Sequence, residues 1–91
     1  MIKHNCYENG KVQSLSFTRA DGLEATVGVI AEAGSYDFGV AERREMIDIL
    51  NGILFDSQGK EYRRGAVLVF QKGDQIKFST KEPVAYACTY F

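Results

Sequence analysis

The amino-acid sequence predicts an all-β domain of many short strands, arranged as a sandwich or a barrel. Turn pairs that contain glycine, such as Asn9-Gly10 and Lys72-Gly73, recur along the whole chain. The stretches between these turns are short and rich in β-branched and aromatic residues, which is typical of all-β folds. No segment carries the apolar stripe of an amphipathic helix.

Each expected strand is a short segment that ends at one of these turns. In chain order, the expected strands are Val12–Thr18, Ala25–Ala31, Ser35–Phe38, Glu45–Leu50, Ile53–Phe55, Lys60–Tyr62, Ala66–Phe70, Gln75–Ser79 and Val84–Tyr90. Polar and apolar side chains alternate from Gln75 to Ser79, so Ile76 and Phe78 should share one face. The only proline, Pro83, precedes the last strand, where its missing N–H removes no ladder hydrogen bond.

The segment 46–55 predicts a β-hairpin. Asn51-Gly52 lies between two apolar runs, and Asn-Gly is the favoured pair for the two positive φ values of a type I′ turn. We therefore expect Glu45–Leu50 and Ile53–Phe55 to pair with each other.

The composition is that of one small domain, which we expect to span residues 1–91. Of the 91 residues, 45% are apolar and 25% are charged, and the formal net charge is −1. This balance gives no general attraction to nucleic acid or to anionic lipid, and no run approaches the ~18 apolar residues of a membrane span. A domain this small buries only about 60–65% of its unfolded surface, so we expect a homodimer.

Cysteine and histidine usage predicts a cytoplasmic protein with free thiols. Cys6 and Cys88 are the only cysteines, they form no CxxC pair, and the N-terminus has no apolar export signal. Cys88 should pack as a small apolar side chain. His4, the only histidine, lies in a segment that we expect to be frayed. Neither a zinc site of Cys and His nor a histidine general base is therefore expected.

Two glycine spacings indicate more closely which all-β fold the chain adopts. Glu45, six residues and then Gly52 match the end of the first motif of the cupin barrel, and residues 65–73 match the spacing of the second. The sequence thus resembles a single-domain cupin-like β-barrel of the jelly-roll type. Metal-binding cupins place histidines where this chain has Gly39, Val40, Ala41 and Ile76. Because one carboxylate, Glu45, does not hold a divalent ion, we expect a metal-free barrel.

Residues spread over nearly the whole chain match one bacterial family. In chain order they are Asn5, Tyr7, Gly10-Lys11-Val12, Ser14, Thr26-Val27-Gly28-Val29, Gly34-Ser35-Tyr36-Asp37-Phe38, Ala41-Glu42, Glu45-Met46, Gly52, Tyr62, Gly65, Val67, Glu82-Pro83, Tyr86, Cys88 and Tyr90-Phe91. In these positions the chain resembles the small cupin-type pyrimidine/purine nucleoside phosphorylases. It departs from their pattern at Arg43-Arg44, Gln71-Lys72 and Thr89.

The resemblance implies phosphorolysis, in which a nucleoside and inorganic phosphate give a free base and a pentose 1-phosphate. Phosphate is then a co-substrate, and no cofactor is expected. Cleavage of a glycosidic bond passes through an oxocarbenium-like sugar, so polar groups must hold the sugar and cations must hold phosphate. Glu42 and Glu45 lie in the best-matching segment and are the candidate catalytic residues, which would grip the sugar hydroxyls.

Aromatic side chains are candidates for the surface that orients the base, because stacking tolerates several bases. These substrate-binding candidates are Tyr36, Phe38, Tyr62, Phe78 and Tyr86. Each ring could instead fill the core of a chain that has no Trp. Lys72 is the candidate phosphate-binding cation, since it lies in a turn whose backbone N–H groups could help to hold an anion, although this cation and the others could instead be solvated surface charges. The other available cations are Lys11, Arg43, Arg44, Arg63 and Arg64.

Two other functions stay open at the level of the sequence. A non-catalytic barrel that binds a small ligand or a sugar phosphate would account for the departures at Arg43-Arg44 and Gln71-Lys72. A metal-dependent cupin enzyme is disfavoured by the missing histidines.

Overall fold

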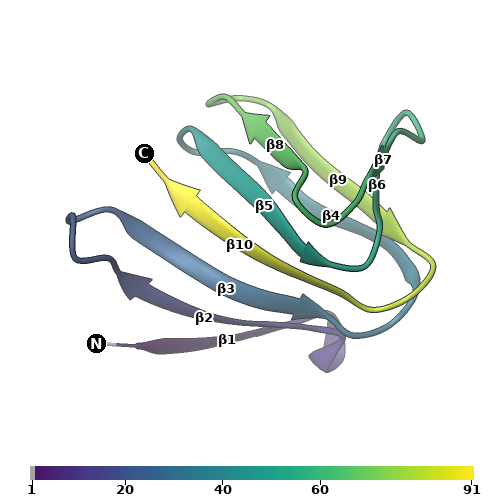
Figure 1. The fold of residues 1–91 in the computed structure, drawn as a ribbon, viewed down its shortest axis with the longest axis horizontal. Coiled ribbons are helices and arrows are strands. Elements are labelled where there is room, and N and C mark those ends of the chain that lie inside the picture. Colours follow the sequence, from purple (N-terminus) through teal and green to yellow (C-terminus); the bar gives the residue numbers. More distant parts are fainter. Residues whose placement is uncertain (1) are drawn as a thin grey trace.

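The computed structural model describes residues 2–91 and forms two facing antiparallel sheets (Figure 1). The elements are β1 (Lys3–Tyr7), η1 (Glu8–Gly10), β2 (Val12–Thr18), β3 (Glu24–Ile30), β4 (Gly34–Val40), β5 (Glu45–Asn51), β6 (Leu54–Asp56), β7 (Glu61–Tyr62), β8 (Val67–Phe70), β9 (Gln75–Thr80) and β10 (Val84–Tyr90). The six-stranded sheet has the order β1-β2-β3-β10-β5-β8, and the four-stranded sheet has the order β4-β9-β6-β7. In the described chain, no helix has the length and apolar character needed to cross a membrane.

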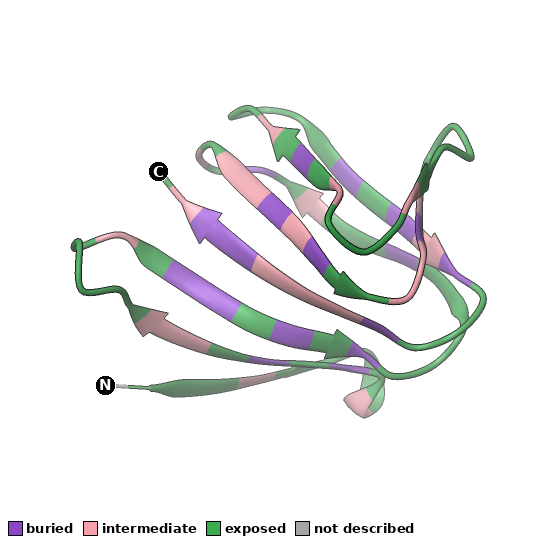
Figure 2. Ribbon diagram, viewed as in Figure 1, coloured by how far each residue is buried: buried purple, intermediate pink, exposed green. Residues whose placement is uncertain are grey.

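The core lies between the two sheets, mainly at the β10–β5–β8 part of the larger one, and it includes the ends of β2 and β3 that carry Val12 and Ile30. The larger sheet contributes Val12, Ile30, Ile47, Ile49, Leu68, Val84 and Cys88, and the smaller sheet contributes Tyr36, Leu54, Ile76 and Phe78. Ile76 and Phe78 are both buried, which confirms their expected common face. Figure 2 shows the contrast with β1, where every residue except the half-buried Asn5 is exposed.

The all-β fold is confirmed, but the two sheets are not closed into a barrel. In residues 2–91, β1 and β8 are the edges of the larger sheet, and β4 and β7 are the edges of the smaller one. β7 and β8 contain only two and four residues, which leaves little backbone for a ladder between the sheets on that side. The result is an open sandwich with one uncovered end at β1 and β2 (Figure 1).

The expected N-terminal fraying is wrong, because an additional strand, β1, occupies that segment. It pairs with β2 along its whole length, from Lys3 opposite Ser16 to Tyr7 opposite Val12. A ring nitrogen of His4 lies 3.2 Å from the side-chain oxygen of Gln13 on β2. Every expected strand overlaps an observed one, and the bounds of β2 and β10 are those expected.

The expected hairpin at residues 46–55 is also wrong. β5 pairs with β10 and β8 in the larger sheet, whereas β6 pairs with β9 and β7 in the smaller one. Gly52 has a φ of 83°, but Asn51 is not among the residues with positive φ, so no type I′ turn forms. A Cβ at Gly52 would overlap the carbonyl oxygen of Pro83. Asn51-Gly52 therefore turns the chain from one sheet into the other, which lets both apolar runs bury against each other across the core.

Candidate functional site

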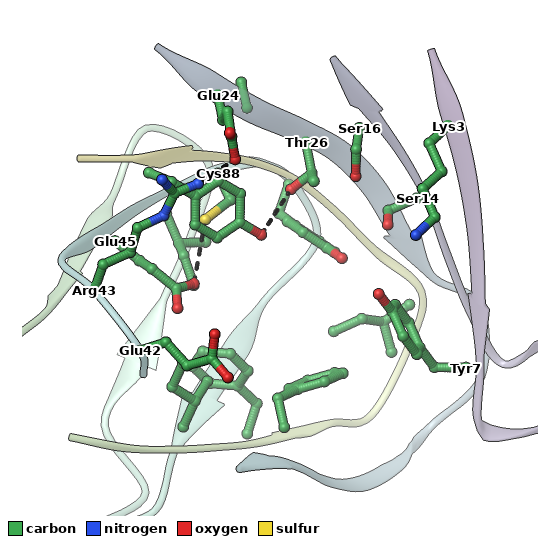
Figure 3. Close-up of a pocket in the computed structure, with 18 of the residues that line it drawn as sticks. Lys3, Tyr7, Ser14, Ser16, Glu24, Thr26, Glu42, Arg43, Glu45 and Cys88 are labelled. Atoms are coloured by element: carbon green, nitrogen blue, oxygen red, sulfur yellow. Dashed lines mark hydrogen bonds and ion pairs between the residues drawn. The ribbon is translucent and has the colours of Figure 1, made fainter. Parts of the chain in front are cut away.

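The candidate site is a cleft of about 790 Å³ at the uncovered end of the sandwich. The inner face of the larger sheet forms its floor, and residues of β4 and β9 and the loop at 41–44 form the opposite side. Figure 3 shows that its polar side chains divide into two groups. Glu24, Glu42, Arg43 and Glu45 lie at one end, and Lys3, Tyr7, Ser14 and Ser16 lie at the other.

Strand register positions these side chains in rows across the larger sheet. One row runs from Lys3 to Ser16, Thr26, Cys88 and Ile47, each residue opposite the next on the neighbouring strand. Because directly opposite residues of a sheet point to the same face, all five share the inner face. The row is polar at the open edge of the sheet and apolar in the core. The same row of paired residues therefore lines the cleft at one end and contributes to the core at the other.

Glu45 is the more buried of the two candidate catalytic carboxylates. It is the first residue of β5, whereas Glu42 is exposed in the preceding loop. Burial raises the pKa of Glu45 above the usual value of 4.5, although a hydrogen bond from the Cys88 thiol and the charge of Arg43 oppose the shift. The thiol lies 3.5 Å from Oε1 of Glu45. Burial also raises the pKa of Cys88, to about 12, so the thiol stays protonated as a donor.

Arg43 is held in place at the acidic end. Its guanidinium forms an ion pair with Glu24 on β3 and lies 5.1 Å from the centre of the Tyr90 ring. The Tyr90 hydroxyl is in turn 3.4 Å from Oγ1 of Thr26. The positive charge of Arg43 is thus already matched by a carboxylate within the cleft.

At the opposite end, hydroxyl groups gather around Asn5. The Asn5 amide nitrogen donates to Oγ of Ser16 at 2.6 Å and to Oγ of Ser14 at 3.3 Å. The Tyr86 ring lies directly over Gly28, where a Cβ would be 2.6 Å from the ring atom Cζ and from the hydroxyl oxygen. Glycine at position 28 is therefore what allows the ring to lie against the sheet. Burial raises the pKa of Tyr86 to about 12, so the phenol is protonated at neutral pH.

Phe38 and Phe78 form the aromatic side of the cleft. Their ring centres are 6.0 Å apart and their planes are inclined by 54°. Phe38 is 37% exposed, whereas Phe78 is only 6% exposed and contacts Phe70 edge-on at 5.6 Å. The Phe38 ring also stacks on Tyr36, with ring centres 6.3 Å apart. Phe38 therefore exposes part of an apolar ring to the cleft, and Tyr36 and Phe78 support it from the core.

The structure brings most of the expected site residues together. Glu42, Glu45, Phe38, Phe78 and Tyr86 all line the cleft.

Three expected substrate-binding residues lie outside the lining of the cleft. Tyr36 is buried, and its hydroxyl donates to the carbonyl oxygen of Glu32 at 2.6 Å. Tyr62 lies on β7, where its hydroxyl donates to the Asp56 carboxylate at 3.1 Å. Lys72 lies in the exposed turn between β8 and β9. Tyr36 and Tyr62 thus use their hydroxyls to fix loops.

Sequence reasoning missed the end of the cleft formed by β1 and β2. Lys3, Asn5 and Tyr7 alternate on β1, and Ser14 and Ser16 alternate on β2. This period of two places polar side chains on the face that should be apolar in a core strand. An alternation that places polar residues at the positions expected to face the core is the sequence signal that could have located this end of the cleft.

The lining residues also define the electrostatic character of the cleft. Its carboxylates are Glu8, Glu24, Asp37, Glu42 and Glu45, and its cations are Lys3 and Arg43. Within residues 2–91, no group of three or more His, Cys, Asp or Glu side chains is arranged to hold a metal ion.

The fold and the cleft define a small cupin-like protein with an acidic, ligand-sized site. The chain belongs to the pyrimidine/purine nucleoside phosphorylase family, whose sequence model matches residues 2–90. Relatives named pyrimidine/purine nucleoside phosphorylase occur in Pseudomonas syringae pv. syringae and Cronobacter sakazakii. They are 39% and 34% identical to this chain, and each alignment covers 99% of both sequences.

Solved structures agree with this assignment at the level of the fold. A protein of unknown function from Vibrio parahaemolyticus is 29% identical, with a TM-score of 0.88 over 100% of this chain and 99% of its own. The hydroxypropylphosphonic acid epoxidase of S. wedmorenis, at 13% identity, has a TM-score of 0.76 over 99% of this chain and 55% of its own. The second likeness shows a shared cupin-like fold.

Proposed function

We propose that the chain is a nucleoside phosphorylase and that the cleft is its active site. The observation that carries the proposal is the meeting of Glu42 and Glu45 with Phe38, Phe78 and Tyr86 in one cleft of about 790 Å³. A cleft of this size is typical of small-molecule sites, and the family of the chain is named for this reaction.

In the proposed reaction, a phosphate oxygen forms a bond to the anomeric carbon while the carbon–nitrogen bond to the base breaks. The bonding electrons leave with the base, which takes up a proton, and the products are a free base and a pentose 1-phosphate. Glu42 and Glu45 accept hydrogen bonds from the sugar hydroxyls, and their negative charge favours the oxocarbenium-like transition state. Phe38 stacks on the base through an apolar face, which supports broad use of purines and pyrimidines.

The experiment is to incubate the purified protein with uridine, cytidine, inosine, adenosine or guanosine, with and without phosphate, and to separate the products by chromatography. We expect free base and pentose 1-phosphate only when phosphate is present. The proposal is wrong if no base is released, or if release is equally fast without phosphate.

The roles of the two carboxylates are tested separately. Glu42→Gln and Glu45→Gln should each lower kcat/KM for the nucleoside by about 100-fold, the usual effect of removing a group that stabilises the transition state. Glu61→Gln is the matched control, because Glu61 pairs with Arg63 on the surface outside the cleft. Wild-type rates in both cleft variants would remove this site assignment while leaving the reaction intact.

The charge of the cleft favours a second candidate function, a cupin-like protein that binds a small ligand without catalysis. Five carboxylates and two cations line the cleft, and one of the cations, Arg43, is paired with Glu24. Such a cleft suits neutral, hydroxyl-rich ligands such as a nucleoside. Calorimetric binding of uridine with no base release in phosphate would favour this candidate over the phosphorylase.

We also propose that the chain forms a homodimer through the outer face of the larger sheet. Leu15, Val27, Val29, Val67 and Val69 are each 43–47% exposed, and strand pairing places them on the face opposite the core. A second copy would cover this apolar surface. Light scattering should give twice the chain mass of 10.2 kDa, and Val27→Lys should give a monomer. A monomeric wild-type protein would contradict the proposal.

The two thiols support the proposed cytoplasmic location. Cys6 is exposed and Cys88 is buried, and both are free. An exposed free thiol persists most readily in a reducing compartment. Fractionation of cells that express the chain at its natural level tests this location.

A further inference from the structure

The proposed reaction requires a site for phosphate, and the two ends of the cleft differ in their suitability for an anion. At one end, the carboxylates of Glu24, Glu42 and Glu45 gather together with Arg43 (Figure 3). A phosphate dianion placed there would meet like charges. At the other end, Lys3 lies among hydroxyl groups (Figure 3).

Lys3 is the cation whose charge is available to a ligand. It lies on β1 directly opposite Ser16, and alternation along β1 directs Lys3, Asn5 and Tyr7 to the cleft side of the strand. Within residues 2–91, no carboxylate oxygen comes within the 4.0 Å of an ion pair with Lys3. The other cleft cation, Arg43, is committed to Glu24.

The neighbouring hydroxyl groups are potential hydrogen-bond donors to a ligand. The Asn5 amide donates to the oxygens of both Ser14 and Ser16, so the hydroxyl proton of Ser16 remains for another acceptor, whereas Ser14 also hydrogen-bonds the Tyr86 phenol. The pKa of the Tyr86 phenol, raised to about 12 by burial, keeps a further proton next to Ser14. Phosphate oxygens accept such hydrogen bonds well. Glu8, which follows β1 in η1, is a carboxylate that lines the cleft next to this end.

We propose that Lys3, Ser14, Ser16 and Tyr86 form a subsite for inorganic phosphate at the β1–β2 end of the cleft. The inference rests on the proposed function, because it assigns the co-substrate of that reaction. It places phosphate and the sugar-binding carboxylates at opposite ends of one cleft. The anomeric carbon then lies between the attacking oxygen and the groups that hold the sugar.

The kinetic test uses Lys3→Met, with Lys60→Met as the matched control. Lys60 is an exposed lysine that lies over the Tyr62 ring, outside the cleft. We expect Lys3→Met to raise KM for phosphate about tenfold, the usual effect of losing a charged hydrogen bond. Its KM for uridine and its kcat at saturating phosphate should stay within about twofold of wild type. Lys60→Met should match wild type in all three.

Ser16→Ala should raise KM for phosphate severalfold and serves as a second, independent variant. Thermal unfolding confirms that each variant is folded before its kinetics are compared. The subsite is wrong if Lys3→Met and Ser16→Ala both keep the wild-type KM for phosphate. It is also wrong if Arg43→Met raises that KM while Lys3→Met does not.

Direct binding separates failure of this inference from failure of the proposed function. Inorganic phosphate is titrated by ³¹P NMR line broadening into wild type, Lys3→Met and Lys60→Met, without nucleoside. Binding that is lost only in Lys3→Met supports the subsite even if wild type releases no base, a result that would overturn only the phosphorylase. Phosphorolysis by wild type together with equal phosphate binding by all three proteins overturns only the subsite.

Discussion

The two halves of the six-stranded sheet share one ladder but have different inner faces. In β10, β5 and β8, the inner positions include Ile47, Ile49 and Leu68, which are buried beneath the smaller sheet. In β1 and β2, most inner positions are polar, among them Lys3, Asn5, Ser14 and Ser16, and only Val12 at the start of β2 joins the core. No strand of the described chain pairs with the free edge of β1. The comparison shows that the backbone of the sheet is the same where it forms the core and where it forms the cleft. The two regions differ in the polarity of their inner side chains and in whether the second sheet covers them.

Strand β10 is the border between the two halves. Its Cys88 is buried in the core cluster, and yet its thiol donates to Glu45 in the cleft. Tyr86, two residues earlier, packs against the core while lining the cleft. Substitutions on either side of this strand should therefore separate effects on stability from effects on function.

The largest effect on stability is expected in the core, where the smaller sheet covers β10, β5 and β8. Leu54 is 2% exposed, and Leu54→Ala should lower the free energy of unfolding by about 3 kcal/mol through lost burial and the cavity left behind. Urea unfolding followed by circular dichroism measures this change. A loss below about 1 kcal/mol would mean that the two sheets do not pack as tightly as described.

Gly28→Ala should have the next largest effect, because the new Cβ would collide with the Tyr86 ring. We expect a loss of about 2 kcal/mol, typical of overpacking. The control is the double variant with Tyr86→Ala, in which the colliding ring is absent. The cost of Gly28→Ala should largely disappear in that background, and equal costs in both backgrounds would show that Tyr86 is not the cause.

Glu45→Gln should give a small rise in Tm that depends on pH. Burial raises the pKa of Glu45 in the folded state above its usual 4.5, so the folded protein binds more protons than the unfolded chain just above that value. The stability associated with protonated Glu45 is complete below the unfolded pKa and is lost as pH rises through the folded pKa. The advantage of Gln should therefore grow from pH 4 to pH 7. An advantage that shrinks over this range would contradict the assigned pKa direction.

The smallest change in stability is expected at Lys3. It is exposed on an edge strand, and Lys3→Met should alter the free energy of unfolding by less than about 0.5 kcal/mol. Leu54→Ala and Lys3→Met together test the difference between the two halves, because the half formed by β1 and β2 should tolerate substitutions that leave the core intact. A Tm loss as large as that of Leu54→Ala would place β1 in the folding core.

Local patterns predicted part of the candidate site, and the limits of that prediction follow from burial. Glu42 and Glu45 were predicted because they lie in the segment that best resembles the family, and both line the cleft. Of the five aromatic candidates, Phe38, Phe78 and Tyr86 line the cleft, whereas the hydroxyls of Tyr36 and Tyr62 donate to the Glu32 carbonyl and to the Asp56 carboxylate. Residue type alone does not distinguish a ring that faces a ligand from one that fixes a loop.

The sequence by itself determined the strands that follow β1, because glycine turns, a single proline and side-chain alternation act over a few residues. It also determined that Ile76 and Phe78 share a buried face. Only the tertiary structure decided which strands pair, so that β5 joins β10 and β8 while β6 crosses to the other sheet. Alternation reports that a strand has an apolar face but does not identify the partner that covers it. For the same reason, only the register of β1 against β2 revealed that Lys3 and the serines share the cleft.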